Sequence, residues 1–152
     1  MGISLDLIQT VLALLGGSGL IGVGSYLLNK FKGRITVKLV TKKNDPDIDD
    51  FILLYDEIIE EHTRIAPEEI IRFIGCHEAT AETSVCDFLF LCKKDGCLIG
   101  FLKAIYCVEK KTLFIAYLGI DKNNEEARKQ ATISLYYKLH KLIKSKFHDC
   151  KA

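Results

Sequence analysis

The most constraining feature of this 152-residue sequence is an uncharged apolar run near its N-terminus. The run covers residues 7–28, which are 22 residues without Asp, Glu, Lys or Arg. As an α-helix it would be roughly 33 Å long, enough to cross the hydrocarbon core of a bilayer. Residues 35–152 have the mixed apolar and charged composition of an ordinary water-soluble domain. The sequence therefore predicts two parts, a membrane anchor with a basic flank over residues 1–34 and a domain over residues 35–152.

The residues beside the apolar run predict its topology. Asp6 precedes the run, where a secretory signal peptide would carry Lys or Arg. Lys30, Lys32 and Arg34 follow it, and basic residues favour the cytoplasmic side of a membrane. We therefore predict a single transmembrane helix with residues 35–152 in the cytoplasm.

A different interpretation of the run also remains open. It is equally long enough for a buried or self-associating helix of a soluble protein, although its five glycines weaken a helix in water. Two pairs of small residues, Ala13 with Gly17 and Ser18 with Gly22, have the spacing of helices that pack together in membranes. The segment thus allows a homo-oligomer.

The net charge and the spacing of cysteines and histidines argue against several classes of function for the rest of the chain. A net charge of +1 argues against nonspecific nucleic-acid binding, which needs a basic surplus. The six cysteines include no pair with the two-residue gap of a zinc or redox site, and the four histidines lack metal-ligand spacing. We predict no metal site, no nucleic-acid partner and a reducing compartment.

Acidic and basic side chains are concentrated in different parts of the sequence. Residues 45–69 contain ten acidic side chains, which fit the exposed sides of helices. Near the C-terminus the charges are basic, with Lys138, Lys141, Lys144 and Lys146 on one predicted helix. That basic helix is either solvated or in contact with anionic lipid headgroups, which a membrane anchor would bring close.

Residues 35–152 show a clear order of strand and helix patterns. Alternation predicts a strand over residues 35–40, and apolar residues at helical spacing predict a helix capped by Asp47 and a second one opened by Pro67. Three apolar runs bounded by turn residues predict strands over residues 85–92, 97–108 and 112–120. A long helix follows residues 121–124. The order strand, two helices, three strands, helix predicts an α/β fold.

This order and several local motifs resemble the GNAT superfamily of N-acetyltransferases. Residues 87–102, with the turn residues Asp95 and Gly96 and the pair Gly100-Phe101, look like the second and third strands of that family. Residues 114–121 look like its fourth strand, which splays away from its neighbour. The resemblance implies a mixed sheet with flanking helices, and acetyl-CoA as the cosubstrate.

The resemblance also implies the residues that bind acetyl-CoA. The backbone of the fourth strand holds the pantetheine arm in the family, a role that falls here on Leu118, Gly119 and Ile120, and the Gly119 or Ile120 N–H would face the thioester oxyanion. A motif of Arg or Gln, two residues, Gly, one residue, and Gly or Ala holds the pyrophosphate at a helix start. Its best match in this chain is the run Arg128, Lys129, Gln130, Ala131, Thr132 and Ile133. Ala131 and Ile133 depart from the small residues of the motif.

Three hypotheses for function follow. Family members continue after this helix with further strands that complete the acceptor pocket, whereas this sequence ends at Ala152, which implies a fold that is short at its C-terminus. The first hypothesis is a membrane-anchored N-acetyltransferase acting on an unidentified amine, with no residue singled out as its base. The second is a noncatalytic binding or assembly module whose fold a partner chain completes. The third is a membrane-active protein that works through its glycine-rich segment.

Overall fold

The computed structural model describes residues 34–76 and 84–147, and every structural statement below concerns these residues. The chain divides into two compact units, Met1–Gly33 and Arg34–Ala152. The predicted transmembrane run lies in the first unit, outside the described residues, so its topology stays a prediction. Among the helices that are described, none is long and apolar enough to cross a membrane.

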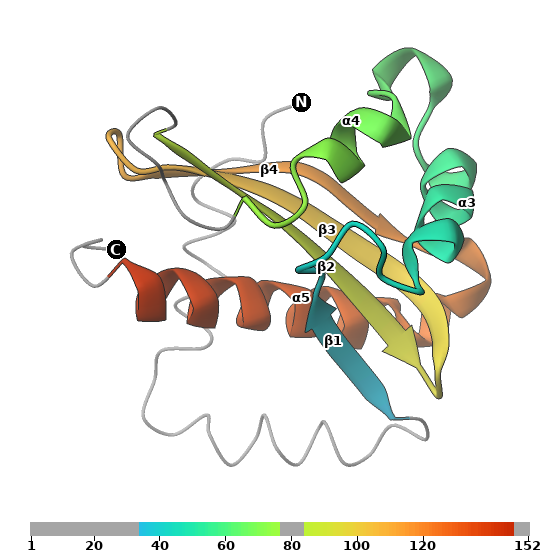
Figure 1. Cartoon of the computed structure of the whole chain (residues 1–152). Helices are drawn as coiled ribbons and strands as arrows, with labels where there is room; N and C mark the ends of the chain where they lie inside the picture. Colours follow the sequence, from blue (N-terminus) through green and yellow to red (C-terminus); the bar gives the residue numbers. More distant parts are fainter. Residues whose placement is uncertain (1–33, 77–83, 148–152) are drawn as a thin grey trace, which may run out of the picture. The chain divides into compact units, whose positions relative to one another are not determined.

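The described residues form an α/β fold around one four-stranded sheet with the strand order β1-β2-β3-β4 (Figure 1). The strands are β1 (Ile35–Leu39), β2 (Val85–Lys94), β3 (Cys97–Cys107) and β4 (Thr112–Ile120). The helices are α3 (Ile48–Ile58), α4 (Pro67–Arg72) and α5 (Glu125–Lys146), and two short 3-10 turns are η1 (Glu61–Thr63) and η2 (Lys122–Asn124). This order confirms the order of strands and helices that the sequence patterns predict.

The sheet differs in one respect from the expected mixed sheet, because all three described pairings are antiparallel. Asp95 and Gly96 both have positive φ, at 51° and 90°, which is the backbone of a tight hairpin turn between β2 and β3. Strands joined by such hairpins must run in opposite directions. The prediction of a mixed sheet is therefore wrong for the described strands. A parallel pair of consecutive strands would need a crossover connection, and none of the three described pairs is parallel.

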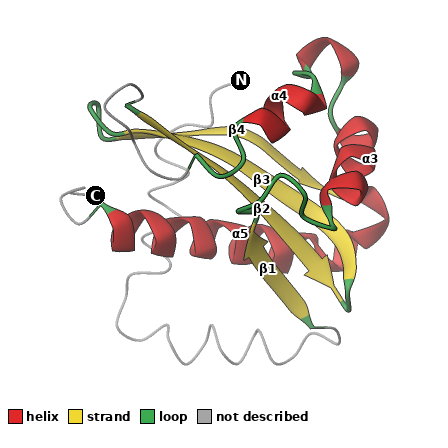
Figure 2. Ribbon diagram, viewed as in Figure 1, coloured by secondary structure: helices red, strands yellow, loops and turns green. Residues whose placement is uncertain are grey.

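Helices cover both faces of the sheet (Figure 2). On one face, α5 packs its apolar side over β1, β2 and β3. Its buried residues there are Ala127, Ala131, Leu135 and Leu139. On the other face, α3 and α4 pack Phe51, Tyr55 and Ile70 against Leu89, Leu91 and Phe101. Each large apolar side chain buried in this way contributes about 1.5–3 kcal/mol, so both helical layers are held by a core of their own.

A cluster of ion pairs holds the start of α3 on the sheet. Asp47 is the N-cap residue, as predicted, but its carboxylate makes no cap hydrogen bond. It pairs instead with Lys38 on β1 and with Lys93 on β2, where the Lys93 Nζ to Asp47 Oδ1 distance is 2.6 Å. Asp45 accepts a further hydrogen bond from Lys38 at 2.7 Å. The cluster therefore ties the helix start to two strands.

We expect Asp47→Asn to destabilise the fold in a pH-dependent way. Hydrogen bonds from Lys38 and then Lys93 hold the pKa of Asp47 below its ordinary value. A carboxylate of this kind stabilises the fold above its unfolded-state pKa of about 3.9, and the contribution is lost as the pH falls through the folded-state pKa. The free energy of unfolding should fall by about 1–3 kcal/mol near neutral pH, the worth of hydrogen bonds to charged groups. Urea denaturation of the full-length chain measures it.

The same experiment in acid completes this test. The difference between the wild-type chain and Asp47→Asn should shrink as the pH falls below the unfolded-state pKa of about 3.9, because protonation of Asp47 then favours the unfolded chain. Glu57→Gln, at an exposed position of α3, is the matched control and should change stability by less than about 0.5 kcal/mol. An Asp47→Asn effect of equal size at neutral and acid pH would contradict the charge-based explanation.

Candidate functional site

The strand residues predicted to bind acetyl-CoA lie at the end of β4. Gly119 is buried there, and Leu118 and Ile120 are half-buried. Within the described sheet, β4 pairs with β3 on one side and leaves its other backbone edge without a strand partner. The structure therefore places Leu118–Ile120 on an edge strand of the described sheet, but Gly119, which is almost entirely backbone, is buried, so the exposed surface of this stretch belongs to Leu118 and Ile120.

Close packing explains the glycine at position 119. Gly119 lies opposite Phe101 in the register of β3 and β4. A Cβ at this position would come within 2.6 Å of the Phe101 ring atoms Cε1 and Cζ, which is shorter than any real contact of this type. The aromatic ring thus requires a glycine here whether or not the Gly119 backbone binds a ligand.

The helix residues predicted to bind the pyrophosphate lie inside α5 rather than at its start. The helix begins at Glu125, three residues before Arg128. The backbone N–H groups of residues 130–133 therefore bond to carbonyls one turn earlier and are not free to bind phosphate. Gln130 and Ala131 are buried against the sheet, Thr132 is half-buried, and Ile133 is exposed. The motif does not form a backbone cradle in this structure.

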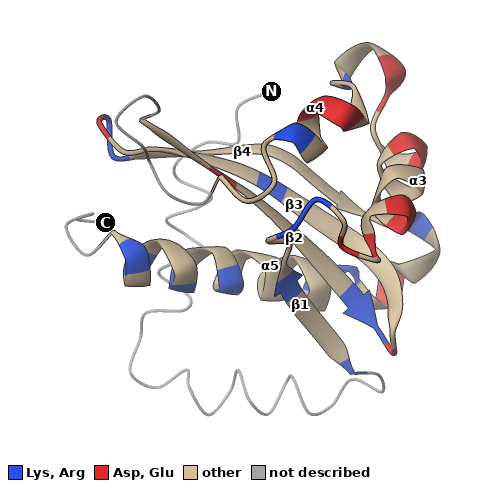
Figure 3. Cartoon of the chain, in the orientation of Figure 1, with Lys and Arg blue, Asp and Glu red and all other residues tan. Residues whose placement is uncertain are grey.

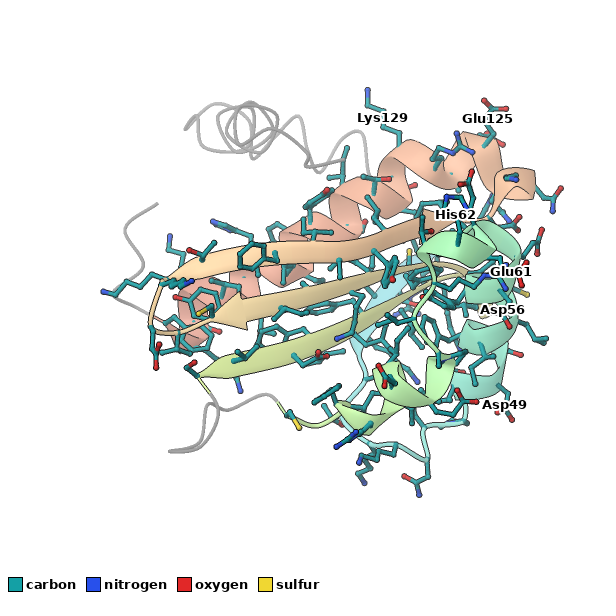
Figure 4. The ribbon with its side chains drawn as sticks, turned by 90° about the horizontal axis from the view of Figure 1, so that it is seen from above. Asp49, Asp56, Glu61, His62, Glu125 and Lys129 are labelled. Atoms are coloured by element: carbon teal, nitrogen blue, oxygen red, sulfur yellow. The ribbon has the colours of Figure 1, made fainter. Side chains whose placement is uncertain are left out.

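Arg128 and Lys129 are the two residues of this motif whose side chains can meet a phosphate. Both are exposed on the second turn of α5. Figure 4 shows the Lys129 and Glu125 side chains pointing away from the sheet on the outer side of the helix. As cations, Arg128 and Lys129 retain the charge complementarity that a phosphate needs.

The chain's own carboxylates occupy the start of α5. Asp121 Oδ1 accepts hydrogen bonds from the Asn123 backbone N–H at 2.9 Å and from the Asn123 side chain at 3.1 Å. Its Oδ2 accepts from the Asn124 side chain at 2.7 Å. Glu125 and Glu126 follow in the first turn. The N-terminus of a helix carries a partial positive charge, which these negative side chains neutralise as a phosphate would. They therefore compete with a phosphate for this position.

A buried ion pair is a second polar feature, which the sequence patterns do not predict. Asp87 on β2 and Lys103 on β3 pair with each other and are only 8% and 2% exposed. Lys103 lies opposite Leu89 and opposite Tyr117 in the sheet register, which places the pair on the face that α3 and α4 cover. Its signal in the sequence is a lone charge inside each of two strongly apolar strands.

Two tyrosines beside this pair hold η1 over the sheet. The rings of Tyr55 and Tyr117 meet edge to face, with centroids 5.3 Å apart. The Tyr117 hydroxyl donates to the Thr63 carbonyl at 2.8 Å, and the Tyr55 hydroxyl both donates to the Ile65 carbonyl and accepts from the Ile65 N–H. Burial, followed by the Tyr117 hydroxyl, raises the pKa of Tyr55. Tyr55 is therefore neutral at physiological pH and acts as a structural hydrogen-bonding group.

Two of the four strand cysteines lie in the core, whereas Cys97 is exposed and Cys107 is half-buried. Cys86 and Cys92 are buried, as their apolar neighbours predict. Burial raises the pKa of Cys92 to about 11, so it is a thiol rather than a thiolate at neutral pH and is a poor nucleophile. Cys76 is exposed, and the next residue, His77, lies outside the described residues.

Comparison with known proteins shows a shared fold. The chain is similar to the C-terminal DUF2156 domain of a protein from Agrobacterium fabrum named as a lysylphosphatidylglycerol synthetase, with a TM-score of 0.58 and 15% identity. The match covers 88% of this chain and 40% of the other. No protein-family model and no curated protein sequence matches the chain. At this identity the likeness establishes the fold alone, so the chain has the fold of this synthetase domain and spans 40% of its length.

Proposed function

We propose that residues 35–152 transfer an acyl group from an activated donor to an amine, with acetyl-CoA as the first donor to test. The observation that carries this proposal is the fold shared with the synthetase domain, whose name refers to a product bearing a lysyl group. A lysyl group is an aminoacyl group, so the name describes acyl chemistry. The GNAT resemblance of residues 87–102 and 114–121 supports the same class of reaction.

The proposal places the acyl donor along the end of β4 and the outer side of α5. The edge of β4 at Leu118–Ile120 has no strand partner among the described residues, and a pantetheine arm would meet it at the half-buried Leu118 and Ile120. The donor phosphates then lie near Arg128 and Lys129, because the carboxylates of Glu125 and Glu126 repel them from the helix start. This arrangement replaces a backbone phosphate cradle by side-chain cations.

We expect the paired change Arg128→Ala and Lys129→Ala to weaken acetyl-CoA binding at least about tenfold. Each hydrogen bond to a charged group contributes about 1.5–3 kcal/mol, and about 1.4 kcal/mol corresponds to a factor of ten in affinity. Isothermal titration of the full-length chain with acetyl-CoA measures the effect. The matched control is Lys42→Ala with Lys43→Ala, which removes two positive charges from an exposed loop elsewhere in the chain.

The titration has two outcomes that count against the proposal. Equal affinity of the wild-type chain and the Arg128→Ala, Lys129→Ala variant would refute the phosphate assignment. A folded wild-type chain that gives no saturable heat would refute acetyl-CoA as the donor.

One observation favours a second function, the noncatalytic binding or assembly module. The carboxylates at the start of α5 oppose a phosphate ligand, while the free edge of β4 and the exposed ring of Phe114 are open to another chain. A partner strand pairing with β4 would extend the sheet. The same titration separates the two functions: absence of acetyl-CoA binding, together with a dimeric or larger mass by light scattering, supports the module.

A further inference from the structure

Beyond its first turn, which contains Glu125 and Glu126, the charged side chains of α5 are all positive. Between Ala127 and Lys146 the helix contains six Lys and Arg side chains and no Asp or Glu. Lys129, Lys138, Lys141 and Lys144 are all exposed. The net charge of the whole chain is only +1, so this basic face is a local feature that the average conceals.

Exposed apolar groups lie among these lysines. Ile133 is 38% exposed and Tyr137 is 52% exposed. Intervals of four residues separate Lys129, Ile133, Tyr137 and Lys141. Side chains at this spacing lie on the same side of a helix, so the four form one line along α5. Because α5 packs on the sheet through Ala131, Leu135 and Leu139, this line is not part of the core. A tyrosine and an isoleucine flanked by lysines are typical of helices that lie at a membrane interface.

The opposite side of the sheet carries the opposite charge (Figure 3). Between Ile48 and Arg72, eight acidic side chains accompany only two basic ones, Arg64 and Arg72. All eight acids are exposed, namely Asp49, Asp50, Asp56, Glu57, Glu60, Glu61, Glu68 and Glu69. Asp49, Asp56 and Glu61 lie on the side of α3 and η1, away from α5, in Figure 4. The sheet thus separates an acidic layer from a basic one.

We propose that the outer face of α5 docks on an anionic lipid surface, with the acidic layer of α3, η1 and α4 turned toward water. The opposite charges of the two layers determine this orientation. An anionic leaflet attracts the basic layer and repels the acidic layer, within a screening distance of about 8 Å at physiological salt. Each lysine close to such a leaflet strengthens attachment by about fivefold.

The sequence favours a lipid surface over a soluble anionic partner. Residues 7–28 form an apolar run long enough to cross a bilayer, and Lys30, Lys32 and Arg34 follow it. A chain carried to a membrane by this run presents its other basic residues to lipid headgroups at high local concentration. This inference does not depend on acyl transfer, because its test changes Tyr137, Lys141 and Lys144, whereas the test of the acyl donor changes Arg128 and Lys129.

The absence of tryptophan from the sequence permits a direct test in the full-length chain. Tyr137→Trp introduces one fluorophore on the basic face, and Leu53→Trp introduces one at a 71% exposed position of α3 on the acidic layer. Each variant is mixed with vesicles of phosphatidylcholine alone or with phosphatidylserine, and with brominated lipids as quenchers. The local reporter matters because residues 7–28 alone can attach the chain to any vesicle.

We expect the emission of the Tyr137→Trp chain to move to shorter wavelength and to be quenched with phosphatidylserine vesicles, and high salt to reverse both effects. The Leu53→Trp chain should show neither effect. Adding Lys141→Ala and Lys144→Ala to Tyr137→Trp should lower the equilibrium constant for docking of α5 on the anionic vesicles, as read from the quenching, by about 25-fold, two lysines at about fivefold each. Acetyl-CoA binding should be unchanged by this lysine pair, which separates a failure here from a failure of the proposed acyl transfer.

Three results would overturn the proposal. One is equal quenching of the Tyr137→Trp and Leu53→Trp chains, which would mean that α5 has no preferred contact. A second is the same quenching in vesicles without phosphatidylserine, which would exclude the anionic surface. The third is a spectral shift with polyglutamate but not with vesicles, which would assign the basic face to an acidic protein.

Discussion

Lys103→Ala is expected to lower the free energy of unfolding by about 3–5 kcal/mol, because it leaves the partner carboxylate buried without its cation. Lys103 is 2% exposed and Asp87 is 8% exposed, and the two form an ion pair between β2 and β3. Water cannot replace the lost cation at such low exposure. Urea denaturation of the full-length chain, followed by circular dichroism, measures the change.

Two control variants test whether the loss of stability comes from breaking the buried ion pair. Lys110→Ala removes an exposed lysine from the turn between β3 and β4 and should change stability by less than about 0.5 kcal/mol. Replacing both partners, Lys103→Met with Asp87→Leu, should recover most of the loss, because a buried ion pair contributes little beyond an apolar pair of similar volume. If the double variant were as unstable as Lys103→Ala, the loss of the cation beside the buried carboxylate would not be the cause.

Phe101→Ala is expected to cost about 3–5 kcal/mol of stability, the usual range for a large aromatic side chain removed from a core. Phe101 is fully buried and packs edge to face on Phe51 at a centroid distance of 5.2 Å, with Tyr55 at 5.8 Å. Gly119 lies against its ring. Truncation therefore leaves a cavity among β3, β4 and α3, and denaturation of the full-length chain reports the loss.

Phe114→Ala is the matched control for Phe101→Ala. Phe114 lies on β4 and is 55% exposed, so its loss should cost less than about 1 kcal/mol. Similar losses for the two variants would show that Phe101 is not the centre of the core between the sheet and α3.

Local patterns predict the elements of this fold well, for physical reasons. Alternating residues at 35–40 match β1, and three apolar runs bounded by turn residues match β2 to β4. The runs of β2 and β3 are apolar at successive positions because helices cover both faces of the sheet. Pro67 begins α4 because its fixed φ and missing N–H suit the first helical turn. The position of Asp47 is also predicted, but its role is not, since the lysines that it pairs with come from two distant strands.

Strand register explains why the buried ion pair could not be predicted. An uninterrupted hairpin from Asp95 and Gly96 would put Asp87 and Lys103 on opposite faces of the sheet, because side chains alternate. The structure instead has an irregularity at Cys92/Lys93, which shifts the register by one residue. That shift brings the two charges to the same face. A bulge of this kind leaves no clear signal in a single sequence.

The positions of the candidate-site residues in the fold are predicted in part, while their role in binding stays a prediction. The residues near the end of β4 and on α5 follow from the order of elements, and the structure does join them through η2. The order of elements does not predict whether the motif forms a backbone phosphate cradle, because this depends on the residue at which α5 starts. Hydrogen bonds from Asn123 and Asn124 to Asp121 determine that start. Those local hydrogen bonds begin the helix at Glu125 and place the motif residues one turn inside it.

The proposed function of the chain is transfer of an acyl group from an activated donor to an amine. The most direct measurement is the transfer of an isotope-labelled acetyl group from acetyl-CoA to a mixture of small primary amines and a lysine peptide, followed by mass spectrometry. The claim predicts labelled acetyl-amine in the presence of the full-length chain, reduced by Arg128→Ala with Lys129→Ala and unchanged by Lys42→Ala with Lys43→Ala. Labelled product at the rate of the chain-free reaction, from a folded chain that also fails to bind acetyl-CoA, would contradict it.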